Sequence, residues 1–144
     1  MSFTYEEIRD FMLAYFPAYT EKAQDPVLQP EMDRFYAPDI IIDDGLVTGR
    51  EQWYRACLSH PAIIDTLTLN KLCVDERNLF VSAMVTATPT ERATGKKLME
   101  LKMNAFYTLK ATDEGHLVIA RLNGFSESNP ARLIQLMDIY GMRH

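Results

Sequence analysis

The sequence has few of the residues that build metal sites and disulfide frameworks. Its 144 residues include two cysteines, Cys57 and Cys73, and three histidines, His60, His116 and His144. The two cysteines form neither a disulfide framework nor a zinc-binding spacing, and the histidines do not cluster as ligands would. We therefore expect no metal site and no cofactor.

Basic charge and long apolar runs are also scarce. Fifteen Lys and Arg residues stand against 20 Asp and Glu residues, which gives a net charge of −5. Binding of nucleic acid needs a basic surface, so we expect no nucleic-acid partner. No apolar run approaches the length that spans a bilayer, and the N-terminus lacks a signal-peptide pattern. We expect a cytoplasmic protein with no membrane partner.

The remaining composition is that of an ordinary globular protein. Apolar residues make up 47% of the chain and charged residues 24%. A chain of this length without repeats, low-complexity stretches or linkers suits one core. We predict a single domain over residues 1–144.

Helix signals gather in the first 60 residues and at the end of the chain. Thr4 and Glu7 have the spacing of a capping box, and Pro17 should kink or divide the helix that follows. Short helices are predicted over residues 31–36 and 50–59. Asn129-Pro130 predicts the start of a closing helix that ends at Gly141. The first helix carries an apolar stripe at helical spacing: Ile8, Phe11, Met12, Tyr15 and Tyr19.

The central part of the chain is rich in strand-forming residues. Four runs, over residues 66–74, 78–88, 97–111 and 117–127, are separated by short turn-like links and predict an antiparallel meander. Helices followed by a meander indicate the α+β class. We predict a cone-shaped, curved antiparallel sheet wrapped over three N-terminal helices, with an added C-terminal helix. The apolar interior of such a cone is a natural small-molecule pocket.

One stretch points to chemistry. Ile40 to Ile42 read as a buried strand, and Asp43 and Asp44 follow it directly. Two carboxylates at the rim of an apolar interior would have raised pKa values, which suits a general base. The alternative is a strand end with two solvated acids before a glycine turn.

Three segments in this order resemble the nuclear-transport-factor-2-like superfamily, and more narrowly the SnoaL-like polyketide cyclases and the ketosteroid isomerases. They are residues 35–44, 48–53 and 113–121. The resemblance implies the cone fold. It leaves the chemistry open, because the fold hosts isomerases, cyclases, dehydratases, epoxide hydrolases and non-catalytic binding domains.

The resemblance also implies site residues. The isomerase pattern places its proton-shuttling Asp where this chain has Asp44, and an oxyanion-stabilising tyrosine on the first helix, where Tyr15 or Tyr19 stands. The second oxyanion donor of the pattern is an Asp, and Tyr107 stands there instead. That departure argues against steroid isomerisation itself, although a phenol can still donate a hydrogen bond.

Other side chains complete the expected site. His60 is a candidate acid or base, because its unperturbed pKa lies near physiological pH, or else a partly exposed residue at a helix end. The residues expected to bind substrate, beside Tyr19, are Tyr36, Asp43, Trp53, Tyr54, Met84, Met103 and Leu122.

The register of the last hairpin decides which side chains enter the cone. Pairing of Tyr107 with Ala120 would place Leu122 inside and both Arg121 and Asn123 outside, whereas a slip of one residue would exchange these sets. The sequence is compatible with both. The outer face would then carry a row of apolar side chains, Leu117, Ile119, Phe125 and Phe106, which predicts a homodimer.

These observations lead to two classes of function. The first is a small enzyme of the SnoaL-like cyclase or isomerase type, with an Asp base and Tyr donors acting on an apolar carbonyl compound. A dehydratase or an epoxide hydrolase on the same cone is a close variant. The second is a non-catalytic ligand-binding or dimerisation domain, favoured if Asp43 and Asp44 both point to solvent and the cone is plugged by Met and Phe side chains.

Overall fold

The computed structural model describes residues 2–126 and 130–141. The helices are α1 (Tyr5–Ala18), α2 (Arg50–Cys57) and α3 (Pro130–Ile139). A π-helical segment (Tyr19–Ala23) and two 3₁₀ segments (Gln29–Arg34 and Asp43–Gly45) supplement them. The strands are β1 (Tyr36–Ile42), β2 (Val47–Thr48), β3 (Ile63–Asp75), β4 (Phe80–Glu91), β5 (Leu101–Ala111) and β6 (Leu117–Ser126).

Helix α1 begins at the capping box that the sequence predicts. The amide of Glu7 donates to Thr4 Oγ1 at 3.2 Å, and the Thr4 amide donates to Glu7 Oε1 at 3.1 Å. Pro17 lies inside α1, and the α-helical geometry continues for one more residue, to Ala18. The proline has no N–H to donate, and two residues later the chain passes into the wider π-helical segment.

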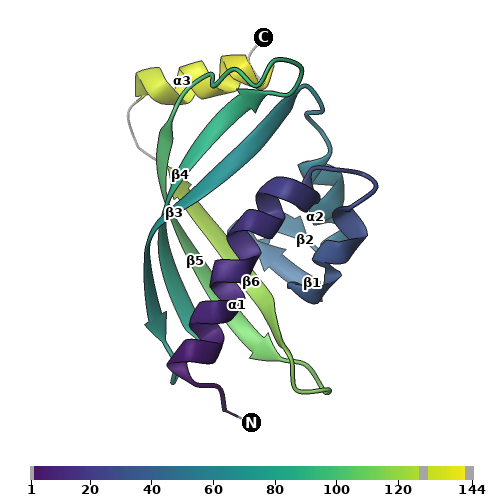
Figure 1. Cartoon of the computed structure of the whole chain (residues 1–144), viewed down its shortest axis with the longest axis vertical. Coiled ribbons are helices and arrows are strands. Elements are labelled where there is room, and N and C mark those ends of the chain that lie inside the picture. The colour runs from purple at the N-terminus through teal and green to yellow at the C-terminus, as the bar shows by residue number, and fades with distance from the viewer. Residues whose placement is uncertain (1, 127–129, 142–144) are drawn as a thin grey trace.

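The six strands form one sheet in the order β2-β1-β6-β5-β4-β3. All neighbours are antiparallel except β1 and β6, which run parallel. The sheet is curved and unclosed, and α1 lies diagonally across one face (Figure 1). Alternate strand residues point from this face toward the helix, among them Val81, Ala83, Ala105, Tyr107 and Leu109. The α+β cone architecture expected from the sequence is confirmed.

The β5–β6 register differs from the predicted one. Tyr107 pairs with Leu122 and not with Ala120. The observed register differs from the predicted one by two residues. Because side chains alternate between the two faces of a strand, Leu122 still lies on the same face as Tyr107, as predicted. Opposite Thr108 and Leu109, β6 has one extra residue, because Thr108 pairs with Arg121 and Leu109 with Ile119. This bulge reverses which β6 side chains point inward on its far side. Ile119 is therefore buried in the core, and so is Leu117, whereas the prediction placed both on the outer face.

The outer face of the sheet carries an aromatic cluster. Phe80 stacks on Phe106 with 5.9 Å between ring centroids, and Phe125 meets Phe106 edge-on at 5.5 Å. Phe125 is 53% exposed. The placement of Phe106 and Phe125 on this face agrees with the prediction.

Helix α3 lies across the far end of the sheet, away from the N-terminus (Figure 1). Leu136 and Ile139 pack there against a small second core of Ala87, Met99 and Leu101. Gly141 follows with a φ of +66°, the left-handed conformation of a helix stop. Asn129, the expected cap of this helix, lies outside the described residues. No described helix has both the length and the apolar character needed to cross a membrane.

Candidate functional site

Three tyrosines from different elements meet in the main core. Tyr15 of α1 lies with its hydroxyl oxygen 2.8 Å from that of Tyr36 of β1, and its ring centroid is 5.7 Å from that of Tyr107 of β5. All three side chains are buried. The structure thus brings together the two phenols, Tyr15 and Tyr107, that the sequence proposes as oxyanion donors.

Burial keeps these phenols neutral. Desolvation is the largest cause that raises the pKa of Tyr15, Tyr36 and Tyr107 above the ordinary value of a tyrosine, and the neighbouring phenols raise that of Tyr15 further. The indole of Trp53 lies beside Tyr36, with 6.5 Å between ring centroids, and its Nε1 is buried. These residues fill the centre of the cone and can exchange hydrogen bonds but not protons near neutral pH.

Asp44 does not lie at the rim of this core, so its expected role as a buried base is wrong, and the alternative of two solvated acids before a glycine turn is confirmed. Its side chain is 80% exposed and accepts a hydrogen bond of 3.1 Å from Asn123 Nδ2. The physical reason is a 3₁₀ turn, Asp43–Gly45, that follows directly after the strand ends at Ile42. Asp43 and Asp44 both have positive φ, 49° and 56°, and the in-and-out alternation of the strand stops there. Asp43 is also exposed, and its Oδ1 accepts from the Gly124 amide at 3.0 Å.

The other predicted binding residues divide between the core and the surface. Tyr19 and Leu122 are buried in the main core, and Tyr54 packs against it while its hydroxyl donates to Asp33 at 2.7 Å. Met103 is half-buried beside the second core under α3. Met84 is 51% exposed on the outer face, so its expected place in the pocket is wrong. The strand alternation that turns Ala83 and Val85 inward turns Met84 outward.

His60 has a charged partner that the sequence analysis missed. Its Nδ1 lies 3.0 Å from the carbonyl oxygen of Ile63, and its Nε2 lies 3.9 Å from Asp65 Oδ2. A carbonyl oxygen only accepts, so Nδ1 carries a hydrogen and Nε2 is the atom free to take or give a proton. The two side chains are 19% and 23% exposed.

Asp65 occupies a poorly solvated corner. Desolvation raises the pKa of its carboxyl group, and the positive charge of His60 opposes that rise. Burial, followed by the negative charge of Asp65, raises the pKa of the Cys57 thiol to about 12. Tyr19 has a raised pKa as well, from desolvation first and from Cys57 and Asp65 after it. The Tyr140 hydroxyl donates to Asp65 Oδ1.

The position of Asp65 is fixed through its backbone. Gln24 Nε2 donates to the Asp65 carbonyl oxygen at 2.9 Å, and the Asp65 amide donates to Gln24 Oε1 at 2.6 Å. The sequence does hold a signal for this residue, an acid that directly follows Ile63 and Ile64 and stands five positions after His60. That signal was missed because β3 begins at Ile63, three residues before the predicted strand.

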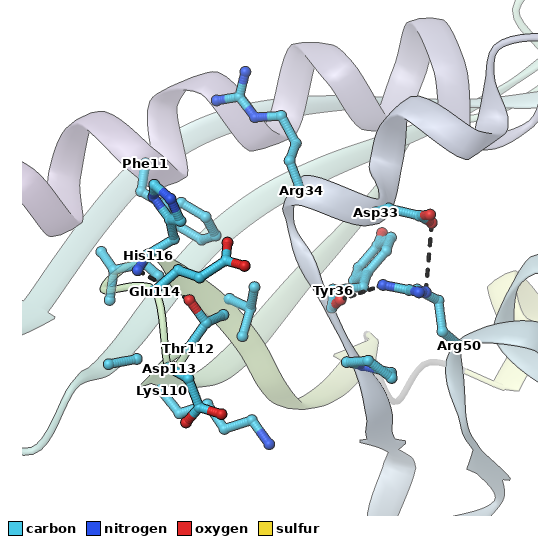
Figure 2. A pocket seen from close by; sticks show the side chains of 14 residues that line it. Phe11, Asp33, Arg34, Tyr36, Arg50, Lys110, Thr112, Asp113, Glu114 and His116 are labelled. Carbon is cyan, nitrogen blue, oxygen red and sulfur yellow. Dashed lines mark hydrogen bonds and ion pairs between the residues drawn. The ribbon is translucent and has the colours of Figure 1, made fainter.

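A groove lies elsewhere, between the β5–β6 hairpin and the segment around Tyr36 (Figure 2). Its volume is about 990 Å³. Arg50 fixes one wall, because its Nη1 donates to the Tyr36 carbonyl at 3.1 Å and its Nε lies 3.4 Å from Asp33. Charged residues of both signs line it, among them Arg34, Lys110, Asp113 and Glu114. This groove is not the apolar hollow that the sequence analysis expects.

No cluster of three or more His, Cys, Asp or Glu side chains that could hold a metal ion occurs among residues 2–126 and 130–141. No protein-family model matches the sequence, and no curated protein matches it.

Comparison with solved structures shows the fold. The chain is similar to a SnoaL-like polyketide cyclase from Agrobacterium tumefaciens, with 16% identity over 90% of this chain and 97% of the other, and a TM-score of 0.65. A ketosteroid isomerase-like protein from Erwinia carotovora atroseptica matches with 18% identity over 88% of this chain and 100% of the other (TM-score 0.60).

A third similar structure is an epoxide hydrolase/cyclase-like enzyme with a role in pyran ring formation in the polyether salinomycin. It has 19% identity over 85% of this chain and 92% of the other, with a TM-score of 0.58. At these identities the likeness establishes the cone fold shared by SnoaL-like and ketosteroid isomerase-like proteins. The residues that would carry an activity must be argued from the site itself.

Proposed function

We propose that this cone-fold chain is a small-molecule enzyme that performs acid–base chemistry on an apolar carbonyl compound at the His60–Asp65 pair. The observation that carries the proposal is the geometry of the imidazole. The Ile63 carbonyl holds Nδ1 as the donor, which leaves Nε2 to act as the base while it faces Asp65 at 3.9 Å. In the catalytic triad a carboxylate holds the nitrogen opposite the reacting one; here the Ile63 carbonyl has that place, and Asp65 lies on the side of Nε2, where it can stabilise the imidazolium.

The proposed step is an enolisation. His60 Nε2 takes a proton from the carbon next to the substrate carbonyl, and the electrons of that C–H bond pass into the enolate. The imidazolium that forms is stabilised by the Asp65 carboxylate. The Nε2 proton then returns to a carbon of the enolate, so an isomerisation or a ring closure needs no cofactor. Such a base contributes on the order of 10²–10⁴-fold to a rate.

A phenol is needed for the enolate oxygen, and we assign Tyr19. Of the two tyrosines that the sequence offered for this role, Tyr19 is the one whose pKa responds to Asp65, after the larger effects of desolvation and Cys57. Tyr15 is bonded to the Tyr36 hydroxyl, whereas the partner of Tyr19 is the Cys57 thiol, a weaker acceptor. Removing an oxyanion donor costs roughly 10²–10³ in rate.

Proton exchange tests this proposal without knowledge of the natural substrate. We expect the protein to accelerate exchange of the α-protons of 2-tetralone in D₂O, followed by proton NMR. His60→Gln should slow the protein-dependent exchange at least 100-fold, and Asp65→Asn at least tenfold. Asp44→Asn is the matched control, because that carboxylate is solvated. Wild-type rates in His60→Gln, or no acceleration by the wild-type protein, would overturn the proposal.

A specific observation also favours a second candidate, a non-catalytic association domain. Tyr15, Tyr36 and Tyr107 fill the cone, Asp43 and Asp44 are solvated, and the outer aromatic cluster is exposed. Under this alternative the chain forms a homodimer through the outer face, and small-molecule turnover is absent. A homodimer is compatible with both candidates and does not distinguish them. The exchange of 2-tetralone protons does, because only the enzyme should accelerate it.

A further inference from the structure

Tyr140 reaches the His60–Asp65 pair from the opposite end of the chain. Its hydroxyl donates to Asp65 Oδ1, and its ring meets the His60 ring edge-on, with 5.0 Å between centroids and an interplanar angle of 76°. The other carboxylate oxygen, Oδ2, faces His60. One aromatic ring with one hydroxyl group thus engages both members of the pair.

In this contact Asp65 accepts from a phenol hydroxyl and His60 meets an aromatic ring. Asp65 Oδ1 is an acceptor in a poorly solvated setting, where a hydrogen bond from an acidic hydroxyl is strengthened. The imidazole offers an aromatic surface for a second ring. A phenol satisfies both at once, whereas an aliphatic alcohol lacks the ring and a hydrocarbon lacks the donor.

The helix that delivers Tyr140 is held by little apolar contact. Leu136 and Ile139 pack on the second core, while Ile134 and Met137 on the same helix are 43% and 37% exposed. A short terminal helix with few buried side chains opens at a low free-energy cost compared with the core of the sheet. Opening of α3 would remove Tyr140 and leave Asp65 Oδ1 and the His60 ring without it.

We propose that the His60–Asp65 corner is a binding site for a phenolic small molecule, and that Tyr140 occupies this site in cis until such a ligand displaces it. This inference rests on the proposed function in using the same pair, and it adds that a phenolic ligand competes with Tyr140 for that pair. The ligand group would take the place of the Tyr140 side chain, with its hydroxyl on Asp65 Oδ1 and its ring against His60.

The test compares 4-methylphenol with 4-methylanisole, in which the donor hydrogen is replaced by a methyl group. Calorimetric titration of Tyr140→Ala should show at least tenfold tighter binding of 4-methylphenol than wild type, because the competing side chain is gone. 4-Methylanisole should bind neither protein measurably. Adding Asp65→Asn to Tyr140→Ala should weaken 4-methylphenol binding at least tenfold. Equal affinity in wild type and Tyr140→Ala, or equal binding of both probes, would overturn the inference.

A second measurement uses the wild-type protein and does not depend on the folding of a variant. Saturating 4-methylphenol should speed amide hydrogen exchange in α3 at least tenfold, while 4-methylanisole should leave it unchanged. Unchanged α3 exchange with 4-methylphenol bound would contradict displacement. The two proposals fail separately: normal 2-tetralone exchange without phenol binding removes only this inference, and phenol binding without 2-tetralone exchange removes only the proposed chemistry.

Discussion

The hydroxyl oxygens of Tyr15 and Tyr36 lie 2.8 Å apart in the main core. The two residues are 21 positions apart in the chain, and each buried hydroxyl has the other as a hydrogen-bond partner. A buried hydroxyl that loses its partner keeps its desolvation cost, which is about 1–3 kcal/mol. The pair should therefore behave as a unit in mutational experiments.

Tyr15→Phe should lower the free energy of unfolding by about 1–3 kcal/mol, because the Tyr36 hydroxyl loses this partner. Tyr15→Phe combined with Tyr36→Phe should cost less than the sum of the two single changes. Urea denaturation followed by circular dichroism measures all three values. Strict additivity would show that the two hydroxyls do not depend on each other.

The core tyrosines should make the fold sensitive to alkali. The pKa values of Tyr15, Tyr19, Tyr36 and Tyr107 are raised, mainly by desolvation, so the folded state holds these protons more tightly than the unfolded state. Their contribution to stability is fully present below pH about 10, the ordinary tyrosine value, and is lost as the pH rises above it.

A spectroscopic titration checks this direction. Phenolate absorbance of the core tyrosines at 295 nm should appear together with the loss of the native circular dichroism signal, and not before it. Core phenolate absorbance at a pH where the fold is still intact would contradict the prediction.

The two cysteines should differ sharply in reactivity. Cys57 is buried, and its pKa is raised to about 12, with desolvation as the largest cause, whereas Cys73 is exposed. The thiolate is the reactive form, so iodoacetamide at pH 8 should label Cys73 and leave Cys57 unmodified in the folded protein. Peptide mass spectrometry reads the two sites, and labelling in urea is the control in which both react. Equal labelling of the folded protein would contradict the burial of Cys57.

The outer aromatic cluster predicts the assembly state. If a second copy covers Phe80, Phe106 and Phe125, light scattering at micromolar concentration should give twice the 16.5 kDa mass of the chain. Phe106→Asp should then yield a monomer, because a charge would be buried in an apolar interface. Val27→Asp is the matched control, since Val27 is an exposed apolar residue outside the sheet. A wild-type protein of 16.5 kDa would exclude the homodimer at that concentration.

The sequence predicts the architecture because its signals are local. Thr4 and Glu7 form their capping box three positions apart, and the strand residues of β4 and β5 alternate as their burial does. The same signals predict that Tyr15 and Tyr107 face one interior. Helix caps and the alternation of buried residues depend on residues that are near one another in the chain, so the order of residues within each segment is sufficient to predict them.

The site escapes prediction where it depends on backbone irregularities and distant contacts. Asp43 and Asp44 both have positive φ, and this turn directs the Asp44 side chain to solvent. The residues that precede Gly45 do not specify such a turn. The bulge that places Ile119 in the core depends on how β6 meets β1 and β5. Asp65 becomes a functional candidate only because residues from three other places in the chain, Gln24, His60 and Tyr140, meet it.

The π-helical segment Tyr19–Ala23 sets the direction in which the side chains at the end of the first helix point. It accommodates an additional residue per turn, and so rotates the following side chains by about 100° relative to an unbroken α-helix. In that orientation Thr20 Oγ1 accepts from the Leu67 amide at 3.1 Å, and Gln24 clamps the backbone of Asp65. Removing a single residue there would turn this side of the helix away from the edge strand, and Asp65 would lose its anchor while the rest of the cone remained.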